Sequence, residues 1–309
     1  MTEQSYHLPV MVREVLDYLK PTRGGVYFDG TVGGGGHSEA ILEASANATI
    51  LGVDRDPEAL EAAARRLARF GERIQLRRSD FAESAEQLAE PLDGALLDLG
   101  ISSRQVDEPA RGFSFRPGTP LDMRMAGAAA PEMPTAADLL NRLPEAELAD
   151  VFRRFGEERR ARRLARAIVR RRGERRFATS DDLLEVLERV LGPRLEPQDK
   201  ARTFQALRIA VNDELGALRR ALPALRERLA PGGVLVVISY HSLEDREVKN
   251  AFREWSRGCI CPPELPVCVC RGRPLGETLT RRPVSAGAEE LAANPRARSA
   301  RLRAWQKAA

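Results

Sequence analysis

Short apolar runs and amphipathic stretches alternate over the first hundred residues. The apolar runs predict four strands, over residues 26–29, 49–54, 74–81 and 94–99. The spacing of apolar positions between the first three strands predicts helices over residues 38–46 and 57–70. Strands that alternate with helices in this way are typical of a parallel sheet covered by helices.

The pattern changes after the fourth strand. Residues 100–134 are rich in glycine and proline and predict loops, whereas residues 135–212 predict helices. The simplest interpretation is an α/β fold, one doubly wound parallel sheet, with an all-helical domain inserted after its fourth strand. The predicted domains are residues 1–107 with 214–309 for the sheet, and residues 108–213 for the insertion.

The strand-and-helix pattern resumes after the insertion. A helix is predicted through residues 215–225, and Pro223 is expected to kink or split it, because proline cannot donate a backbone hydrogen bond. Pro231-Gly232-Gly233 predicts a turn, and residues 234–240 predict a fifth, buried strand.

Composition limits the class of protein. Of the 309 residues, 43% are hydrophobic, but the longest apolar run, residues 234–240, is much shorter than the roughly 18 residues of a membrane span. The N-terminus lacks the basic and apolar regions of a secretory signal. We therefore expect a cytoplasmic protein and exclude the membrane, collagen-like and largely disordered classes.

Positive charge is concentrated in the helical region. The net charge is only +4, yet residues 153–176 hold 12 arginines and 3 glutamates, a local charge of +9 that leaves −5 for the rest of the chain. A helix predicted over residues 159–172 has one apolar face, and its opposite face presents Arg159, Arg163, Arg166 and Arg170. We predict that Arg163, Arg166 and Arg170 contact nucleic-acid phosphates, with a solvated helix face as the alternative.

A glycine-rich segment, Asp29-Gly30-Thr31-Val32-Gly33-Gly34-Gly35-Gly36-His37-Ser38, lies between a predicted strand and a predicted helix. Glycines let a ligand approach the backbone, and the helix start presents free N–H groups, so a nucleotide-like cofactor is predicted. A dinucleotide fingerprint needs glycine or alanine where Ser38 stands, which weakens the nicotinamide interpretation. Asp29 suits the ammonium group of S-adenosylmethionine. The alternative is a glycine-rich turn without a ligand.

Acidic residues also end the next predicted strands. Asp54 could accept the hydroxyls of a ribose, and Asp80 and Phe81 could hold an adenine. Asp98 should face the reacting end of the cofactor, since ligands bind at the carboxyl ends of parallel strands. For each aspartate, a helix cap is the alternative.

The fifth strand delivers a polar cluster, Ser239-Tyr240-His241-Ser242, to the same edge of the sheet. Polar groups directly after a buried strand are costly to leave unsatisfied, so a substrate pocket is predicted there. His241 is one of only three histidines in the chain, and its role could equally be structural.

Four cysteines form a CxC-x6-CxC pattern, Cys259, Cys261, Cys268 and Cys270, in a proline-rich segment. Four thiols can bind zinc, but the usual spacing is C-x2-4-C. A disulfide and reduced, non-essential thiols are the alternatives, and the sequence predicts no metal as part of the active site.

These motifs together resemble one family, the bacterial methyltransferases that modify the exocyclic N4 of a cytosine in the decoding region of 16S rRNA (the MraW/RsmH type). The match runs from residue 7 to residue 303. Its ordered motifs are DGTVGGGGHS (29–38), GVDRDP (52–57), LLDLGISSRQVD (96–107), ARGFSF (110–115), GTPLDMRM (118–125), GEER (156–159), TFQALRIAVNDEL (203–215), ISYHSLEDREVK (238–249) and NPRARSARLR (294–303).

The resemblance implies a class I, Rossmann-like S-adenosylmethionine-dependent methyltransferase with an inserted helical domain. It implies cofactor contacts at Gly35, Gly36, His37, Asp54, Phe81, Asp98 and Gln105; we add Asp29 and Gly33 from the glycine-rich segment. The implied partner is 16S rRNA, within the small ribosomal subunit. The family's acidic residue before RGFSF is replaced here by Ala110.

The predicted catalytic residues are Asp98, His241 and Ser242. We expect Asp98 and carbonyl groups near Gly100 to accept hydrogen bonds from the cytosine amine, and Tyr240 to hold or stack the base. Many amino-methyltransferases use a D/N-P-P-Y/F motif after the fourth strand, which is absent here. A DNA amino-methyltransferase is therefore the weaker alternative, beside a non-catalytic RNA-binding factor of ribosome assembly.

Overall fold

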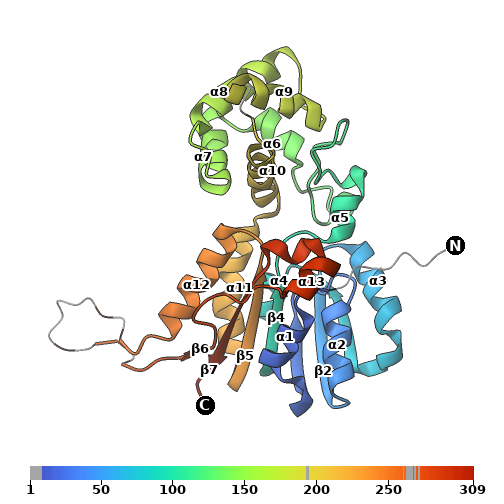
Figure 1. Ribbon diagram of the computed structural model, residues 1–309, viewed down its shortest axis with the longest axis vertical. Helices are drawn as coiled ribbons and strands as arrows, with labels where there is room; N and C mark the ends of the chain where they lie inside the picture. Colours follow the sequence, from blue (N-terminus) through green and yellow to red (C-terminus); the bar gives the residue numbers. More distant parts are fainter. Residues whose placement is uncertain (1–8, 193–194, 260, 262–266, 268, 271) are drawn as a thin grey trace. The chain divides into compact units, whose positions relative to one another are not determined.

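The computed structural model describes residues 9–192, 195–259, 261, 267, 269–270 and 272–309. The chain divides into two compact units, Met1–Gly100 with Leu215–Ala309, and Ile101–Glu214 (Figure 1). The first, here the sheet unit, contains the β-sheet. The second, here the helical unit, is built from α-helices.

The sheet unit contains a seven-stranded sheet with the order β3-β2-β1-β4-β5-β7-β6. Its strands are β1 (Gly25–Asp29), β2 (Ala48–Asp54), β3 (Ile74–Arg78), β4 (Leu92–Asp98), β5 (Leu229–Ser239), β6 (Gly276–Thr278) and β7 (Arg301–Lys307). Strands β1 to β5 pair in parallel, whereas β7 is antiparallel to both β5 and β6. The predicted α/β class with a parallel, doubly wound sheet is confirmed.

The order of the strands reverses between β1 and β4, which are neighbours in the sheet. In open α/β sheets, connections leave such a pair in opposite directions, and ligands bind beyond the carboxyl ends of these strands. The carboxyl ends of β1 and β4 are Asp29 and Asp98. The topology thus identifies the edge at which a site is expected.

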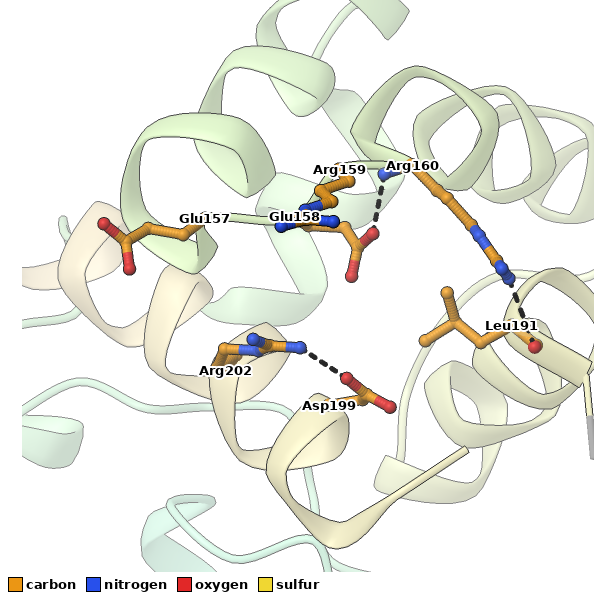
Figure 2. Close-up of a pocket in the computed structure, with 7 residues that line it drawn as sticks. All are labelled: Glu157, Glu158, Arg159, Arg160, Leu191, Asp199 and Arg202. Carbon is orange, nitrogen blue, oxygen red and sulfur yellow. Dashed lines mark hydrogen bonds and ion pairs between the residues drawn. The ribbon is translucent and has the colours of Figure 1, made fainter. Parts of the chain in front are cut away.

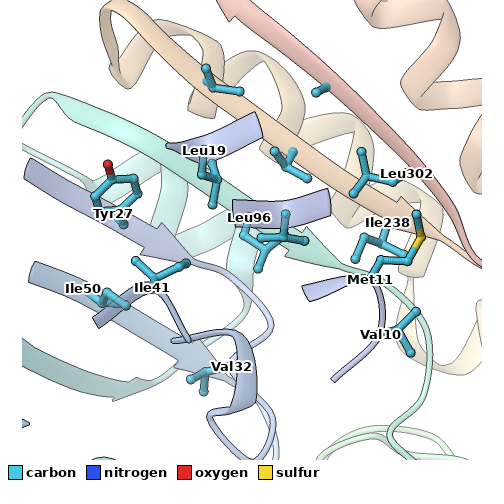
Figure 3. Close-up of a cluster of buried hydrophobic side chains, with 14 of the residues drawn as sticks. Val10, Met11, Leu19, Tyr27, Val32, Ile41, Ile50, Leu96, Ile238 and Leu302 are labelled. Carbon is cyan, nitrogen blue, oxygen red and sulfur yellow. The ribbon is translucent and has the colours of Figure 1, made fainter. Parts of the chain in front are cut away.

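Helices cover both faces of the sheet. One face packs against α1 (Val12–Leu19), α2 (Gly36–Ala44) and α3 (Pro57–Leu67), and the other against α4 (Phe81–Gln87), α11 (Glu214–Arg228) and α12 (Ser242–Trp255). The sheet unit also contains α13 (Ala288–Ala293). Figure 3 shows the first core, in which Met11 and Leu19 lie against Tyr27, Leu96 and Ile238 from the sheet. Alternating strand residues face the two cores, as the pleat requires.

The third strand is shorter than predicted. It ends at Arg78, and Phe81 begins α4. The reason is Asp80, whose carboxylate accepts hydrogen bonds from the backbone N–H groups of Ala82 and Glu83 and so caps the helix. The capping alternative therefore holds for Asp80, which is also ion-paired with Arg55.

Helix α11 continues through Pro223, so the helix is not split there, while a kink stays a prediction. The turn predicted at Pro231-Gly232-Gly233 was wrong, because these residues lie inside β5. The pairing of β5 with β4 shifts in register at these residues, so the extra residues bulge out of the strand. Gly232 has a positive φ of 78° at this bulge.

The helical unit contains α5 (Ser103–Asp107), α6 (Ala136–Arg142), α7 (Glu145–Gly156), α8 (Ala161–Glu174), α9 (Ser180–Leu191) and α10 (Pro197–Asn212). The helical prediction for residues 135–212 is confirmed, and Thr135 starts it as the N-cap of α6. Its core is separate, with Phe152, Leu164, Leu187 and Leu207 fully buried. Among the described residues, no helix is long and apolar enough to span a bilayer.

Candidate active site

Three aspartates end neighbouring strands at one edge of the sheet: Asp29 on β1, Asp54 on β2 and Asp98 on β4. The pairing of β1 with β2 and with β4 brings these ends together. The glycine-rich segment begins directly after Asp29 and leads into α2. This edge is the one at which the reversal of strand order predicts a ligand.

Asp29 is held inside the protein. Its side chain accepts hydrogen bonds from the backbone N–H of Thr31 at 3.2 Å and from the hydroxyl of Ser38 at 2.7 Å, and the residue is 1% exposed. In this arrangement Asp29 fixes the turn after β1 and the first turn of α2. It can act on a ligand through its negative charge, while direct contact with an ammonium group stays a prediction.

Asp54 connects β2 to the glycine-rich segment. One carboxylate oxygen accepts the N–H of Gly33 at 2.9 Å, and the other accepts the N–H of Asp56 at 2.9 Å. Gly33 has a φ of 52°, and a Cβ there would meet its nearest neighbour only at 3.8 Å. The backbone at Gly33 therefore stays open to a ligand while Asp54 holds it in place.

Gly35 and Gly36 are needed for packing as well as for ligand access. Gly35 is the N-cap of α2 with a φ of 83°, and a Cβ would come within 3.0 Å of Leu67. A Cβ on Gly36 would lie 2.9 Å from Pro9. Larger residues at either position would push α2 away from its neighbours, so the glycines bring the start of this helix to the edge of the sheet.

Asp98 contacts two side chains from other parts of the sheet unit. Its Oδ1 accepts a hydrogen bond from the Tyr240 hydroxyl at 2.9 Å, and its Oδ2 lies 3.8 Å from Nδ1 of His37. His37 Nε2 lies 2.8 Å from the carbonyl oxygen of Val10, which can only accept, so Nε2 carries a hydrogen. The carboxylate keeps 21% of its side chain exposed, and Ser102 caps the following helix, α5, in its place.

All three carboxylates have a raised pKa. Burial, with a smaller contribution from the charge of Asp29, raises the pKa of Asp54 and of Asp98 to about 6. Burial raises the pKa of Asp29 as well. Buried like charges disfavour ionisation, and a bound cation would reverse that effect. The edge is therefore electrostatically complementary to a positively charged ligand.

The fifth strand completes the edge with Tyr240, His241 and Ser242. Burial, followed by the nearby Asp98, raises the pKa of the Tyr240 hydroxyl, so the tyrosine is a hydrogen-bond donor at neutral pH. A Cβ on Gly100 would lie 3.3 Å from the Tyr240 ring, which shows how closely the two pack. Ser242 is the exposed first residue of α12.

His241 has a structural role in addition to the predicted chemical one. It is the N-cap of α12, where its Nδ1 accepts the N–H of Glu244 at 3.4 Å and its Nε2 lies 3.2 Å from Oε1 of Glu244. Glu244 in turn accepts the N–H of Tyr240 at 2.9 Å. This capping box holds Tyr240 in position, and a catalytic role for His241 stays a prediction.

Phe81 and Gln105 complete the residues predicted to contact a cofactor. Phe81 begins α4 in the sheet unit and is partly buried near Gly30, whose Cβ would lie 3.1 Å from the Cβ of Phe81. Gln105 belongs to the helical unit, where it forms a capping box with Ser102 and donates to the Met125 carbonyl at 3.2 Å. Their cofactor contacts stay predictions.

Comparison with known proteins identifies the family of this chain. The model of the MraW methylase family matches residues 4–308. The chain belongs to the MraW methylase family. A protein of Gemmatimonas aurantiaca named ribosomal RNA small subunit methyltransferase H is 53% identical over 98% of this chain and 96% of its own. Proteins of the same name from Geobacter sulfurreducens and Heliobacterium modesticaldum are 52% and 51% identical, covering 97% and 98% of this chain and 98% of each relative.

The helical unit of this MraW-family methylase carries the predicted arginine face. On α8, Leu164, Ala165 and Ile168 are buried, whereas Arg163, Arg166 and Arg170 on the opposite face are exposed. The predicted amphipathic helix is confirmed, but it begins at Ala161, so the exposed Arg159 lies before it. Arg166 lies 3.5 Å from Glu145 but keeps 77% of its side chain exposed.

Not all of the +9 segment is available to a partner, however. Arg171 is 5% exposed, donates to Asp182 at 2.5 Å and stacks on Phe177. Arg172 donates to the carbonyl groups of Leu140 and Leu143. These two arginines hold the unit together, so a count of charges along the sequence overstates the surface charge of this MraW-family methylase.

A pocket of about 330 Å³ lies in the helical unit, where the GEER motif joins α7 to α8 (Figure 2). Its lining residues are Glu157, Glu158, Arg159, Arg160, Leu191, Asp199 and Arg202. Three arginines face three acidic residues, with Arg202 donating to Asp199 at 2.5 Å and Arg160 donating to the Leu191 carbonyl at 3.2 Å. Because these charges balance, the pocket of the methylase has no excess charge to select an anion or a cation.

Sequence reasoning missed two contacts that organise the site of this MraW-family methylase. The Tyr240–Asp98 hydrogen bond joins residues 142 positions apart, and the Gly33–Asp54 hydrogen bond joins two different motifs of the chain. No local spacing signals either contact. The pairing of β4 with β5 could have suggested the first, because Asp98 ends β4 and Tyr240 directly follows β5.

Proposed function

We propose that this methylase transfers the methyl group of S-adenosylmethionine to the exocyclic N4 of a cytosine in the decoding region of 16S rRNA. Membership of the MraW methylase family and the names of the relatives support an rRNA substrate. The observation that carries the proposal is the group of three carboxylates around an open glycine-rich segment, because such a group favours a cationic nucleoside. S-adenosylmethionine has a sulfonium and an ammonium group and matches this requirement.

The residues present fit this cofactor. Gly33 offers open backbone, the start of α2 at Gly35 offers N–H groups, and Asp54 has further lone pairs for ribose hydroxyls. Phe81 offers an aromatic face for the adenine, and Asp98 and Asp29 place negative charge near the methionine end. When bound, the cofactor would supply an electrophilic methyl group.

The chain itself must prepare the amine. The N4 lone pair of cytosine is delocalised into its ring, so a hydrogen-bond acceptor at the amine hydrogens is needed to favour attack. Asp98 is such an acceptor, since Tyr240 occupies one lone pair of Oδ1 and leaves others available. Tyr240 fixes the direction of the carboxylate, and its ring is suited to pack against a base.

A methyltransfer assay with three substrates tests the proposal. Full-length protein is incubated with S-adenosylmethionine labelled in the methyl group and with 30S subunits, free 16S rRNA or duplex DNA. We expect label in ribosomal RNA, recovered as N4-methylcytidine after nuclease digestion. Label in duplex DNA would support the DNA alternative, and cofactor binding without transfer to any substrate would support a non-catalytic assembly factor.

The arginine face of α8 should contribute to RNA binding. Changing Arg163, Arg166 and Arg170 together to glutamine keeps good helix formers at exposed positions and removes three charges. The slope of log K against log salt should become shallower by about 2, because each phosphate contact contributes roughly 0.7 with single-stranded RNA. Filter binding to a 16S rRNA fragment at several salt concentrations measures this slope.

A matched control removes three exposed arginines of the sheet unit, Arg13, Arg281 and Arg298, by the same substitution. This variant loses the same net charge but keeps the α8 face. A decrease in slope that is equal in the two variants would mean that only net charge matters. An unchanged slope in the α8 variant would exclude this face from RNA binding.

A further inference from the structure

Three cysteine sulfur atoms cluster in the segment between α12 and β6, which neither the sheet nor the proposed reaction uses. The Sγ atoms of Cys259, Cys261 and Cys270 all lie within 4.8 Å of one another. Cys259 and Cys270, eleven positions apart, have their Sγ atoms 3.8 Å apart. The N–H of Val269 points to Cys261 Sγ at 3.4 Å. Cys268 lies outside the described residues.

The sulfur distances fit metal ligands better than a disulfide. A disulfide requires an S–S distance of about 2.05 Å, which is far below the separation of Cys259 and Cys270. Two thiolates that bind one tetrahedral zinc ion with Zn–S bonds of about 2.3 Å are about 3.8 Å apart. The distance between Cys259 and Cys270 equals this expected separation of two zinc-bound sulfur atoms. A backbone N–H directed at a sulfur atom is also the type of contact that orients a metal ligand.

Two apolar side chains of the segment are exposed to solvent. Val267 and Val269 are 69% and 77% exposed, although they flank the cysteine cluster. A hydrogen bond from the N–H of Leu275 to the carbonyl of Trp255, at 2.8 Å, closes the base of the segment. Loops longer than about 12 to 15 residues are uncommon in compact domains unless they have a function of their own. Binding a metal ion at the cysteine cluster would give this segment such a function.

We propose that the thiolates of Cys259, Cys261 and Cys270 bind a zinc ion that holds this segment in a single conformation. Thiolates favour zinc over magnesium or calcium, and zinc prefers a tetrahedral arrangement, whose sulfur separation matches that of Cys259 and Cys270. Each thiol loses its proton to the solvent on binding, and no electron is transferred. The zinc site lies in a different part of the chain from the residues assigned to methyl transfer, so its role is structural.

Metal analysis of the full-length protein tests this site directly. The protein is purified without a histidine tag, under a reducing agent, and its zinc content is measured by mass spectrometry of the metal. We expect about one zinc ion per chain. The variants Cys259→Ser and Cys270→Ser should each retain less than about a tenth of that, because two remaining thiolates make a weak site. Val269→Ser, which keeps every thiol, is the matched control and should retain full zinc.

Cobalt substitution gives a second measurement that does not depend on the folding of any variant. Wild-type protein reloaded with Co²⁺ should show the thiolate-to-metal charge-transfer band and the visible bands of a tetrahedral site. Wild-type protein that holds no zinc and shows no such bands would overturn the proposal. A metal-free protein whose mass is two hydrogens lower would contain a disulfide and would also overturn the proposal. So would protein that contains iron in place of zinc.

Discussion

Replacing Asp98 with asparagine is expected to decrease kcat by about 10² to 10³-fold at saturating cofactor and RNA, the size of effect found when one preorganised group that stabilises a transition state is removed. Asparagine keeps an oxygen that can accept the Tyr240 hydroxyl, so the geometry of the site should be preserved. What the variant loses is the negative charge next to the amine. Single-turnover assays with labelled cofactor measure the rate, and calorimetry measures cofactor binding separately.

The same variant should be more stable than the wild type without cofactor. The folded-state pKa of Asp98 is about 6, above the ordinary value of 3.8, because burial penalises the charged form. An acid with a raised pKa costs stability as pH rises from about 4 to 6, and the full cost is present above pH 6. The neutral asparagine side chain carries no such cost. We expect a gain of about 1 to 3 kcal/mol in the free energy of unfolding at pH 7.5.

Urea denaturation between pH 4.5 and pH 8 measures this gain. The difference between variant and wild type should be small at the acidic end and reach its maximum above pH 6. Asp17→Asn, the same change at an exposed carboxylate on α1, should shift stability by less than about 0.5 kcal/mol. Wild-type turnover in Asp98→Asn would remove this residue from the reaction, and a pH-independent difference in stability would contradict the raised pKa.

The α/β order and the edge of the site could be predicted because both follow from local patterns. Alternation of apolar runs with amphipathic stretches specified a parallel sheet, and parallel strands place their carboxyl ends together. Asp29, Asp54 and Asp98 were therefore predicted at one edge from their positions alone. The glycines of the segment after β1 were recognisable because close backbone approach requires them at Gly35 and Gly36.

Roles that depend on tertiary contacts could not be predicted. His241 follows a buried strand in a polar cluster, and the same pattern suits a catalytic base or the helix cap that the structure shows. Arg171 and Arg170 are neighbours in an arginine-rich stretch, yet one is buried against Asp182 and the other is exposed. Pro231 was expected in a turn before the fifth strand, yet it lies inside that strand. Burial, which decides each case, is a property of the folded chain.

A buried ion pair between Arg303 on β7 and Asp245 on α12 joins two motifs through residues that have no predicted chemistry. The guanidinium donates to both carboxylate oxygens, at 2.6 and 3.1 Å, and the residues are 5% and 8% exposed. The pair joins the antiparallel edge of the sheet to the helix that begins at His241. Its loss should therefore affect the whole sheet unit.

Arg303→Ala is expected to lower the free energy of unfolding by about 3 to 5 kcal/mol, because it leaves the Asp245 carboxylate buried without its main partner. Arg301, 3.8 Å from the same carboxylate but 52% exposed, can replace only part of the interaction. Urea denaturation at pH 7.5 measures the loss, and Arg298→Ala, at an exposed position nearby, should cost less than about 0.5 kcal/mol.

A double variant separates the charge from the packing. Arg303→Met combined with Asp245→Leu removes both charges and keeps similar side-chain volume, so it should recover most of the stability that Arg303→Ala loses. Recovery would mean that the pair matters because an unpaired buried charge is costly, and that the link between β7 and α12 can be made by apolar contacts. If the double variant were as unstable as Arg303→Ala, the two hydrogen bonds of the guanidinium would themselves hold the strand to the helix.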